Sequence, residues 1–314
     1  MKKKNTKRRY CIRNWKQYNT ALVERGSLTL WLDEAALSGG LNPTQTGRRG
    51  ASRKYTDLAI VCGLTLGAVY GLALRQTQGL VASLLALVGA ALPTPNYTSF
   101  CRRRPGLAVA LPRQAKSQPL HVVVDSTGVK VYGEGEWKVR QHGWSKRRVW
   151  RKLHLGVDEA TGEIVAAVST TQSVTDGPVL PELLDQVPDR IEPVSGDGGY
   201  DKRKCYEAIA ARAARAAIPP QRNARIWRHG NRAGARLQRD ENLRRIRQVG
   251  RRRWKQETGY HRRSLAETTM FRLKTIFGGT LRARTGAGQA TELRLWCAIL
   301  NRMTHRGMPE SYAT

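Results

Sequence analysis

The spacing of apolar and polar residues predicts a helical first part of the chain. Residues 56–104 show a helical pattern, in which a polar turn at Arg75–Gln78 separates two almost wholly apolar runs, Leu58–Leu74 and Gly79–Leu92. The first run is about the minimum length for a membrane span, and the second is too short. We therefore expect two packed helices in the core of a small domain and no membrane segment, with a membrane hairpin as the alternative.

A short basic helix is predicted after these two runs. Pro93 ends one helix, and Pro95 starts another whose last residues are Arg102, Arg103 and Arg104. This is a weak helix-turn-helix pattern, in which Arg102 and Arg103 are candidate DNA contacts. The alternative is an ordinary helical bundle with a basic last turn.

From residue 121 onward the pattern changes to short apolar or alternating runs, which predict β-strands. Three antiparallel-looking strands followed by strand–helix alternation predict an α/β fold, with a mixed sheet flanked by helices. In chain order, the expected elements are strands at 121–125, 128–132, 150–157 and 163–169, a helix at 177–187, a strand at 191–195, a helix at 201–215, a strand near 217–218, and helices at 257–277 and 290–304.

Two acidic residues stand where predicted strands end. Asp125 follows a run of three valines, and burying a carboxylate there is costly unless it meets a cation. Asp197 is flanked by glycines, which let another group approach the backbone closely. Taken alone, each acid also fits an ordinary role as a capping or turn aspartate. Asp201 is interpreted as the N-cap of the following helix.

A third acid lies on the predicted helix 257–277. Arg263, Glu267 and Lys274 follow Tyr260 at offsets of 3, 7 and 14 residues, so the four residues share one helix face within an arc of about 60°. Arg263 and Lys274 are predicted to bind phosphates, and Tyr260 to stack on a base or sugar. The alternative is an exposed, salt-bridged helix.

Together, Asp125, Asp197 and Glu267 predict a metal-dependent catalytic site. Carboxylates crowded into one site repel each other, and one would stay protonated without a metal ion. Magnesium prefers oxygen ligands and keeps waters and phosphate oxygens in its shell. Two such ions about 3.5–4 Å apart can hold the attacking and leaving oxygens of a phosphoryl displacement. The predicted chemistry is therefore phosphodiester cleavage and joining.

The charge of the chain indicates a polyanionic partner. Lys and Arg total 55 against 24 acids, a formal net charge of +31, and self-repulsion at such an imbalance weakens a compact fold. Nucleic acid is the first candidate partner, and a solvated basic surface is the alternative. The five cysteines lie far apart without metal-ligand spacing, which is typical of reduced thiols in a cytoplasmic protein.

Further DNA contacts are expected in two basic segments. One lies between the second and third predicted strands, where a solvated basic hairpin is the alternative. The other is the arginine-rich segment 222–253, which we expect to bind the phosphate backbone. Trp227 or Trp254 could stack on an unpaired base, and a core role for either is the alternative. The candidate contacts in and beside these segments are Arg148, Lys152, Arg251, Arg252 and Trp254.

One spacing on the late helix is very specific. It reads Tyr260-x-x-Arg263-x-x-x-Glu267, with Lys274 after six more residues. Through it the chain resembles the insertion-sequence-five family of bacterial DDE transposases, and no catalytic position departs from the family's pattern. The other segments that carry the resemblance are Asn14-Trp15, Tyr18-Asn19, Leu22–Gly26, Val124–Gly128, Arg151–Leu155 and Gly196–Asp201.

The resemblance implies an RNase H-like catalytic fold, with Asp125 on the first strand, Asp197 after the fourth and Glu267 on a late helix. It also implies two Mg²⁺ or Mn²⁺ ions per active site and binding to terminal inverted repeats and target DNA. A homodimer or higher oligomer would cleave strands at the repeats and transfer the 3′-OH ends into the target. The expected location is the bacterial cytoplasm, at the nucleoid.

The expected domain organisation follows from these patterns. Residues 27–32 could form a short strand or an amphipathic turn within the basic N-terminal segment. The expected parts are a partly ordered basic segment at 1–50, a smaller helical DNA-binding domain with its linker at 51–118, an RNase H-like catalytic domain at 119–277, and a C-terminal helix and tail at 278–314.

Two other functions remain open from the sequence. A metal-dependent nuclease of the same fold would cut DNA without joining it, and no sequence feature separates it from a transposase. A non-enzymatic basic DNA-binding protein would keep every activity when Asp125 is replaced by Ala, whereas a transposase would lose cleavage and retain binding.

Overall fold

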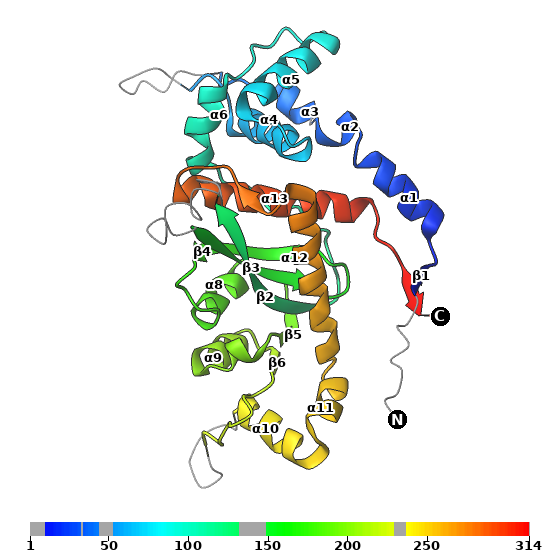
Figure 1. Cartoon of the computed structure of the whole chain (residues 1–314), viewed down its shortest axis with the longest axis vertical. Helices are drawn as coiled ribbons and strands as arrows, with labels where there is room; N and C mark the ends of the chain where they lie inside the picture. The colour runs from blue at the N-terminus through cyan, green and yellow to red at the C-terminus, as the bar shows by residue number, and fades with distance from the viewer. Residues whose placement is uncertain (1–9, 33, 44–52, 132–148, 229–236, 314) are drawn as a thin grey trace, which may run out of the picture. The chain divides into compact units, whose positions relative to one another are not determined.

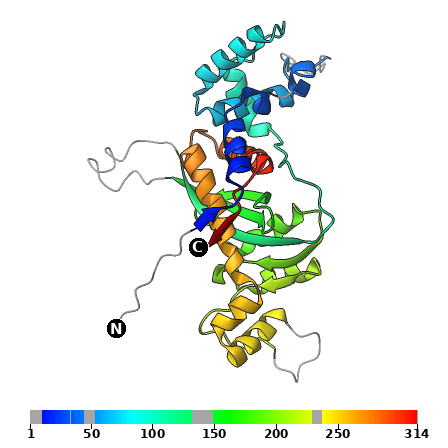
Figure 2. The same cartoon turned by 90° about the vertical axis from the view of Figure 1, so that its right-hand side faces the viewer.

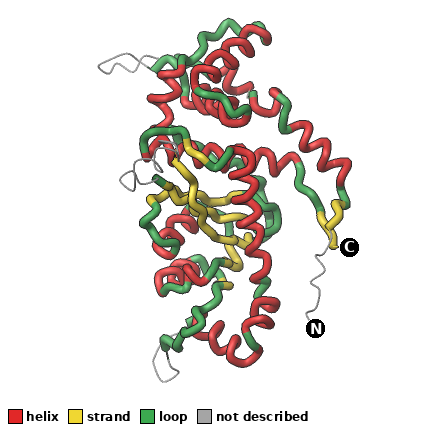
Figure 3. The backbone as a smooth tube through the Cα atoms, in the orientation of Figure 1, coloured by secondary structure: helices red, strands yellow, loops and turns green. Residues whose placement is uncertain are grey.

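The protein forms two compact units in a computed structural model (Figures 1 and 3). Residues 1–101 and 301–314 make up the terminal unit, and residues 102–300 make up the sheet unit. The structure describes residues 10–32, 34–43, 53–131, 149–228 and 237–313.

The sheet unit is built on one mixed sheet with the strand order β4-β3-β2-β5-β6, and β7 also pairs with β2 (Figure 1). β2, β3 and β4 are antiparallel neighbours, whereas β5 is parallel to both β2 and β6. This confirms the predicted mixed sheet. The strands are β2 (Leu120–Val131), β3 (Trp150–Asp158), β4 (Ile164–Thr171), β5 (Ile191–Ser195), β6 (Arg215–Ala217) and β7 (Thr280–Leu281).

Helices cover both faces of this sheet. Val122 and Val124 of β2 pack into one core with residues of α8 and α9. Asp125 points to the opposite face, since side chains alternate along a strand, and it pairs there with Arg263, just before α12. α12 lies across the sheet from α8 and α9 (Figures 1 and 2). The helices and 3₁₀ turns are η1 (Arg104–Gly106), η2 (Gly177–Val179), α8 (Leu180–Asp185), η3 (Gly198–Tyr200), α9 (Arg203–Ala211), α10 (Gln238–Val249), α11 (Arg251–Glu257), η4 (Tyr260–Arg263), α12 (Ser264–Phe277) and α13 (Gly286–Arg306).

The first two predicted strands are one continuous strand, β2. It pairs with β3 without interruption from Val122 to Lys130, so Ser126-Thr127-Gly128 form no turn. The prediction that Asp125 ends a strand was therefore wrong: Asp125 lies inside β2. The valines before it are buried on both sides, at 0–1% exposure, which accounts for their near-continuous apolar pattern.

Two predicted helices are shorter than expected because the backbone turns left-handed within them. The helix predicted at 201–215 ends as α9 at Ala211, since Ala213 has φ 52° and the residues after it join the sheet as β6. The helix predicted at 257–277 begins as α12 only at Ser264. Gly259 has φ 66°, and a 3₁₀ turn follows it.

The terminal unit contains the two expected apolar helices, but the break between them lies earlier than predicted. α4 starts at the capping residue Thr56, and Gly71 with φ 66° follows its end. The polar residues 75–78 are helical within α5, where Gln76 accepts a hydrogen bond from the backbone N–H of Ala73. The elements are β1 (Tyr10–Ile12), α1 (Trp15–Glu24), α2 (Leu28–Trp31), α3 (Glu34–Ser38), α4 (Asp57–Val69), α5 (Leu74–Leu87), α6 (Tyr97–Arg103, reaching into the sheet unit) and β8 (Ser311–Ala313).

The terminal unit also joins the two ends of the chain. β1 and β8 pair as a two-stranded antiparallel sheet, and Asn14 donates to the carbonyl of Met308 at 3.0 Å. Residues 28–31, predicted as a strand or a turn, form a single helical turn. Among the described helices, none alone is long and apolar enough to cross a membrane. α4 and α5, bent by 111°, meet the length and composition criteria only as a pair.

Candidate active site

Asp125 and Asp197 stand at the same level of neighbouring strands. β2 and β5 run parallel, and their last paired residues are Val123 and Ser195. Two residues further on come Asp125, still within β2, and Asp197, just after the end of β5. Because paired strands lie about 4.8 Å apart, this register brings the two acids into one neighbourhood.

The carboxylate of Asp125 is largely buried, with 17% of its side chain exposed. Oδ1 accepts a hydrogen bond from the backbone N–H of Ser126 at 2.8 Å, and Oδ2 pairs with Arg263 at 3.0 Å. The pKa of Asp125 is nevertheless raised, first by burial and then by the charges of Asp197 and Glu267. The site therefore disfavours the ionised form of Asp125 beside the other two acids unless a further cation is present.

Asp197 is held in a tight turn. Its Oδ1 accepts a hydrogen bond from the backbone N–H of Gly199 at 2.8 Å and so caps η3. A Cβ atom on Gly199 would stand 2.9 Å from that same oxygen, and one on Gly196 would stand 2.9 Å from the ring of Tyr200. The glycines around Asp197 therefore permit the close approach that the sequence predicted.

Glu267 reaches the site from α12. Arg263 lies one helical turn before it and pairs with both Glu267 and Asp125, so a single guanidinium connects the two acids. This contact confirms the predicted shared face for Arg263 and Glu267, although the regular helix begins only at Ser264. The side chain of Glu267 is 55% exposed and that of Arg263 is 23% exposed.

The three acids suit a hard divalent cation by their chemistry. All their donors are carboxylate oxygens, which Mg²⁺ and Mn²⁺ prefer. The pKa of Asp125 is raised first by burial and then by the other two acids, and a cation would favour the ionised form. In this conformation Arg263 supplies the neutralising charge. Within the described parts of the chain, no group of three or more His, Cys, Asp or Glu side chains is arranged to hold a metal ion.

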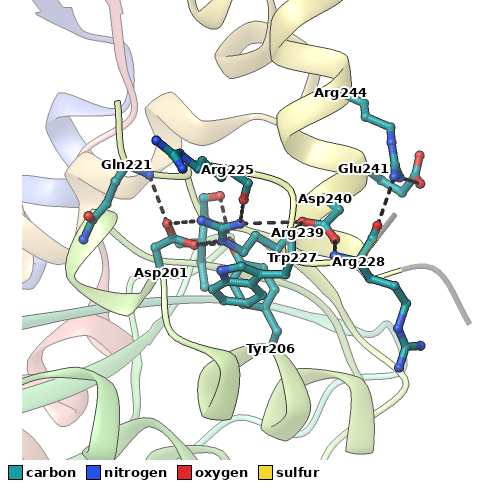
Figure 4. Close-up of polar contacts among 11 residues, drawn as sticks. Asp201, Tyr206, Gln221, Arg225, Trp227, Arg228, Arg239, Asp240, Glu241 and Arg244 are labelled. Carbon is teal, nitrogen blue, oxygen red and sulfur yellow. Dashed lines mark hydrogen bonds and ion pairs between the residues drawn. The ribbon is translucent and has the colours of Figure 1, made fainter. Parts of the chain in front are cut away.

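Asp201 anchors the far end of the turn that carries Asp197. It is not the N-cap of α9, because Lys202 takes that position. Its carboxylate accepts hydrogen bonds from Arg239 Nε at 2.7 Å and from the backbone N–H of Gln221 at 3.0 Å, and both Asp201 and Arg239 are buried (Figure 4). The ion pair therefore joins the turn to the start of α10.

The same network fixes the segment that leads into α10. The guanidinium of Arg239 lies 3.8 Å from the ring centroid of Trp227 and donates to the carbonyl of Arg225 at 2.7 Å (Figure 4). The buried carboxylate of Asp240 accepts the backbone N–H groups of Trp227 and Arg228, both at 2.9 Å. Sequence reasoning missed this network, although Asp240 is one of very few acids in the arginine-rich segment.

The remaining residues of the predicted helix face have different surroundings. The ring of Tyr260 lies under Lys255, at 4.7 Å, and 6.2 Å from the ring of Trp254. Trp254 is 1% exposed, so its geometry favours the alternative role in the core. Lys274, in the last turn of α12, is partly buried and makes no ion pair with a described acid.

Other candidate DNA contacts are partly engaged within the fold. The ammonium of Lys152 pairs with Asp176 at 2.7 Å. Arg251 donates to the carbonyl of Pro220 at 2.8 Å, whereas Arg252 is exposed. None of these residues touches the three acids.

Two candidate contacts lie in the last turn of α6 and one lies outside the structure. Arg102 is exposed and Arg103 is partly buried. α6 follows the two prolines, but it starts at Tyr97 and not at Pro95 as predicted. Arg148 lies outside the described residues.

Two protein-family models match the chain. A family model described as a transposase DDE domain matches residues 116–302, more than half of the chain, and a second with the same description matches residues 23–134. No solved structure matches the chain. Proteins with such domains bind DNA and generally use divalent metal ions. The chain therefore belongs to the DDE transposase family, and its enzymatic class is that of the polynucleotidyl transferases and endonucleases.

Proposed function

We propose that the protein is the transposase of a bacterial insertion sequence of the insertion-sequence-five family. It cleaves DNA strands at the terminal inverted repeats of its element and transfers the 3′-OH ends into target DNA. Asp125, Asp197 and Glu267 are its catalytic acids, and together they hold two Mg²⁺ or Mn²⁺ ions.

Two observations support this proposal: Asp125 and Asp197 lie at matching positions of neighbouring strands, and one guanidinium pairs with both Asp125 and Glu267. The electrostatics support it, because the pKa of Asp125 is raised first by burial and then by the charges of Asp197 and Glu267.

The order of elements supports an RNase H-like catalytic domain. Asp125 lies on the first strand of the large sheet, Asp197 directly follows its fourth strand along the chain, and Glu267 lies on a late helix. These are the positions that the family resemblance implies. We assign this domain to residues 119–277, with the C-terminal helix and tail at 278–314.

Bound divalent ions would supply Lewis acidity at the scissile phosphate and ease deprotonation of the attacking water or 3′-hydroxyl. The protein's own part is to hold oxygen donors in place on rigid elements. Asp125 is fixed by the N–H of Ser126, and Asp197 by the N–H of Gly199. Glu267, more than half exposed, is the donor with most freedom to adjust.

Arg263 links carboxylate chemistry to phosphate binding. Its guanidinium is partly exposed while it pairs with Asp125 and Glu267. With divalent cations neutralising those acids, the guanidinium would be free to bind a phosphate oxygen, for which its planar fork is well suited. Lys274 would add a second positive charge on the same helix.

The remaining parts of the chain provide DNA binding in this proposal. Exposed arginines of α10 and α11, with Arg252 among them, contact the phosphate backbone. The helices within residues 51–118 recognise the element ends, with Arg102 and Arg103 at the end of α6 as contacts. The protein acts on DNA as a homodimer or higher oligomer, in the bacterial cytoplasm at the nucleoid.

The test is incubation with supercoiled DNA that carries candidate element ends, with Mg²⁺ and with EDTA. Wild-type protein should nick or cut the DNA only with Mg²⁺. Asp125→Asn, Asp197→Asn and Glu267→Gln should each lose cleavage but retain DNA binding in a mobility-shift assay. Asp185→Asn, an exposed acid on α8, serves as the control and should cleave normally. Cleavage by all three triad variants would refute the proposed site.

A second assay separates a transposase from a nuclease of the same fold. Pre-cut ends with free 3′-hydroxyls are incubated with a target plasmid and Mg²⁺. Covalent joining of the ends to the plasmid supports strand transfer, whereas hydrolysis products alone would favour the nuclease. Unchanged activity in Asp125→Ala would favour a DNA-binding protein without catalysis.

A further inference from the structure

A fourth acid, Asp176, borders the proposed active site. It follows β4 and precedes η2. Its Oδ1 pairs with the ammonium of Lys152 at 2.7 Å, and Lys152 also donates to the carbonyl of Val174 at 3.3 Å. Both side chains of the pair are 22% exposed. A positive charge on β3 is thereby held by Asp176.

The second neighbour of Asp176 is a buried histidine. His154 is fully buried, with Nδ1 at 3.4 Å from Asp176 Oδ1 and Nε2 at 2.9 Å from Thr170 Oγ1. Burial lowers the pKa of His154 to about 4, so the imidazole is neutral at physiological pH. Of these two neighbours of Asp176, only Lys152 therefore carries a positive charge.

Asp176 and Asp197 approach the same glycine. A Cβ atom on Gly199 would stand 2.9 Å from Asp197 Oδ1 and 3.6 Å from Asp176 Oδ2. The next residue after Asp176 also packs on this turn, because a Cβ on Gly177 would stand 3.7 Å from the carbonyl oxygen of Gly199. The Lys152–Asp176 pair thus lies directly beside the turn that positions Asp197.

A buried hydroxyl provides an independent sign that these acids share one neighbourhood. Tyr200 is fully buried, and its hydroxyl has no hydrogen-bond partner among the described residues. Its pKa is raised, first by burial and then by the charges of Asp176, Asp125 and Asp197. All three carboxylates therefore lie near enough to the Tyr200 hydroxyl to influence its ionisation.

We propose that Asp176 is a positioning residue for the catalytic acids: it holds the ammonium of Lys152 away from Asp197, so that the Asp197 carboxylate stays available to a divalent cation. This inference rests on the proposed function. Carboxylates that are close together would each attract a free lysine ammonium. An ammonium paired with Asp197 would compete with a metal ion for the same oxygens.

The experiment measures Mn²⁺ binding to the full chain without DNA, by isothermal titration calorimetry. Asp176→Asn keeps the size of the side chain but removes the charge that holds Lys152. We expect its Kd for Mn²⁺ to rise about tenfold, the lower end of the effect of groups that support metal ligands. Asp185→Asn changes the net charge equally on an exposed surface and should bind Mn²⁺ like the wild type.

A double variant separates this role from a merely structural one. In Asp176→Asn/Lys152→Met the competing ammonium is gone, so Mn²⁺ affinity should return towards the wild-type value. A role in which Asp176 supports the turn of Asp197 independently of Lys152 predicts binding at least as weak as in the single variant. A folded double variant that binds no better than Asp176→Asn overturns the proposal, and so does a single variant that matches Asp185→Asn.

Two further outcomes are decided by controls. If circular dichroism shows that Asp176→Asn alone does not fold, the double variant decides, because removing both partners of an ion pair is tolerated better than removing one. Weak Mn²⁺ binding by the folded double variant then overturns the inference. Asp197→Asn tests the proposed function itself: if it binds Mn²⁺ as tightly as the wild type, the proposed metal site fails, whatever Asp176 does.

Discussion

At the scale of single residues, the fold disfavours the ionised form of one carboxylate in the proposed active site, that of Asp125. The pKa of Asp125 is raised by burial and by two neighbouring acids, and Arg263 offsets this only in part. Because the folded-state pKa lies above that of the unfolded chain, the folded protein binds more protons between the two values. Stability therefore falls as pH rises through this range, and the penalty is fully present at neutral pH.

The first prediction concerns the stability of Asp125→Asn. Without divalent ions at pH 7, its melting temperature should equal or exceed that of the wild type, because Asn still accepts the N–H of Ser126 but carries no charge. The difference in melting temperature should vanish below pH of about 4, where Asp125 of the wild type is protonated and also carries no charge. Differential scanning fluorimetry across pH, with EDTA, measures it. A variant clearly less stable than the wild type at pH 7 would show that Asp125 stabilises the fold.

The second prediction compares two adjacent glycines. In Gly199→Ala the new methyl would stand 2.9 Å from Asp197 Oδ1 and push that carboxylate aside, whereas in Gly198→Ala the nearest atom is 3.8 Å away. Neither residue has a positive φ, so backbone strain does not separate them. We expect cleavage to fall about 100-fold in Gly199→Ala, as for a misplaced catalytic group, and to persist in Gly198→Ala. Equal cleavage rates for both variants would contradict the role of this contact.

At the scale of elements, the turn after β5 is braced from the arginine-rich segment. Asp201 and Arg239 form a buried pair, and Asp240 binds two backbone N–H groups of the segment before α10. Arg239 of this segment therefore serves to dock α10, whereas exposed arginines such as Arg252 remain available for DNA. The same chain then continues through α11 and η4 to the helix that carries Glu267.

The third prediction tests this brace. Arg239→Ala leaves Asp201 buried without its cation and should lower the free energy of unfolding by about 3–5 kcal/mol. Arg244→Ala removes a partly exposed guanidinium paired with Glu241 and should cost less than about 1 kcal/mol. Urea denaturation monitored by circular dichroism compares them. Hydrogen exchange in residues 221–228 should rise only in Arg239→Ala, and similar losses in both variants would argue against a buried brace.

The elements that the sequence predicts well are those whose pattern reflects one local cause. β3, β4 and β5 have clear apolar runs, and α6 follows the two prolines closely. The errors arise where tertiary contacts decide. Ser126-Thr127-Gly128 reads as a turn but continues β2 because β3 pairs with it. The very short strands β1, β7 and β8 have almost no pattern of their own and depend on distant partners.

The candidate site shows the same limit. The family spacing from Tyr260 to Lys274 predicts which acid lies on the late helix, and the contact of Arg263 with Glu267 agrees with it. The partners of Asp201 and Asp176 were not predicted, because Arg239 and Lys152 lie far from them in sequence. Such pairs depend on the register of strands and the docking of helices, which no local pattern contains.

At the scale of the whole molecule, a net charge of +31 accompanies a fold whose buried acids mostly have cationic partners. Among the described residues, every arginine and lysine except Arg239 is at least partly exposed. Self-repulsion of that size weakens the folded state, and a DNA polyanion would relieve it. Binding should accordingly release counterions and depend steeply on salt.

The last prediction assigns part of that salt dependence to named residues. Log–log plots of DNA affinity against salt concentration should lose about 0.9 of slope for each phosphate contact removed. Arg252→Ala and Lys274→Ala should each show this loss, because Arg252 is exposed and Lys274 has no ion pair with a described acid.

Arg190→Ala is the control: Arg190 is also exposed, but it precedes β5 and so lies at the opposite end of that strand from Asp197. Fluorescence anisotropy with a duplex of fixed length measures the slopes. An equal loss in Arg190→Ala would mean that DNA senses only total charge, whereas a loss confined to the first two variants would place the phosphates along α11 and α12.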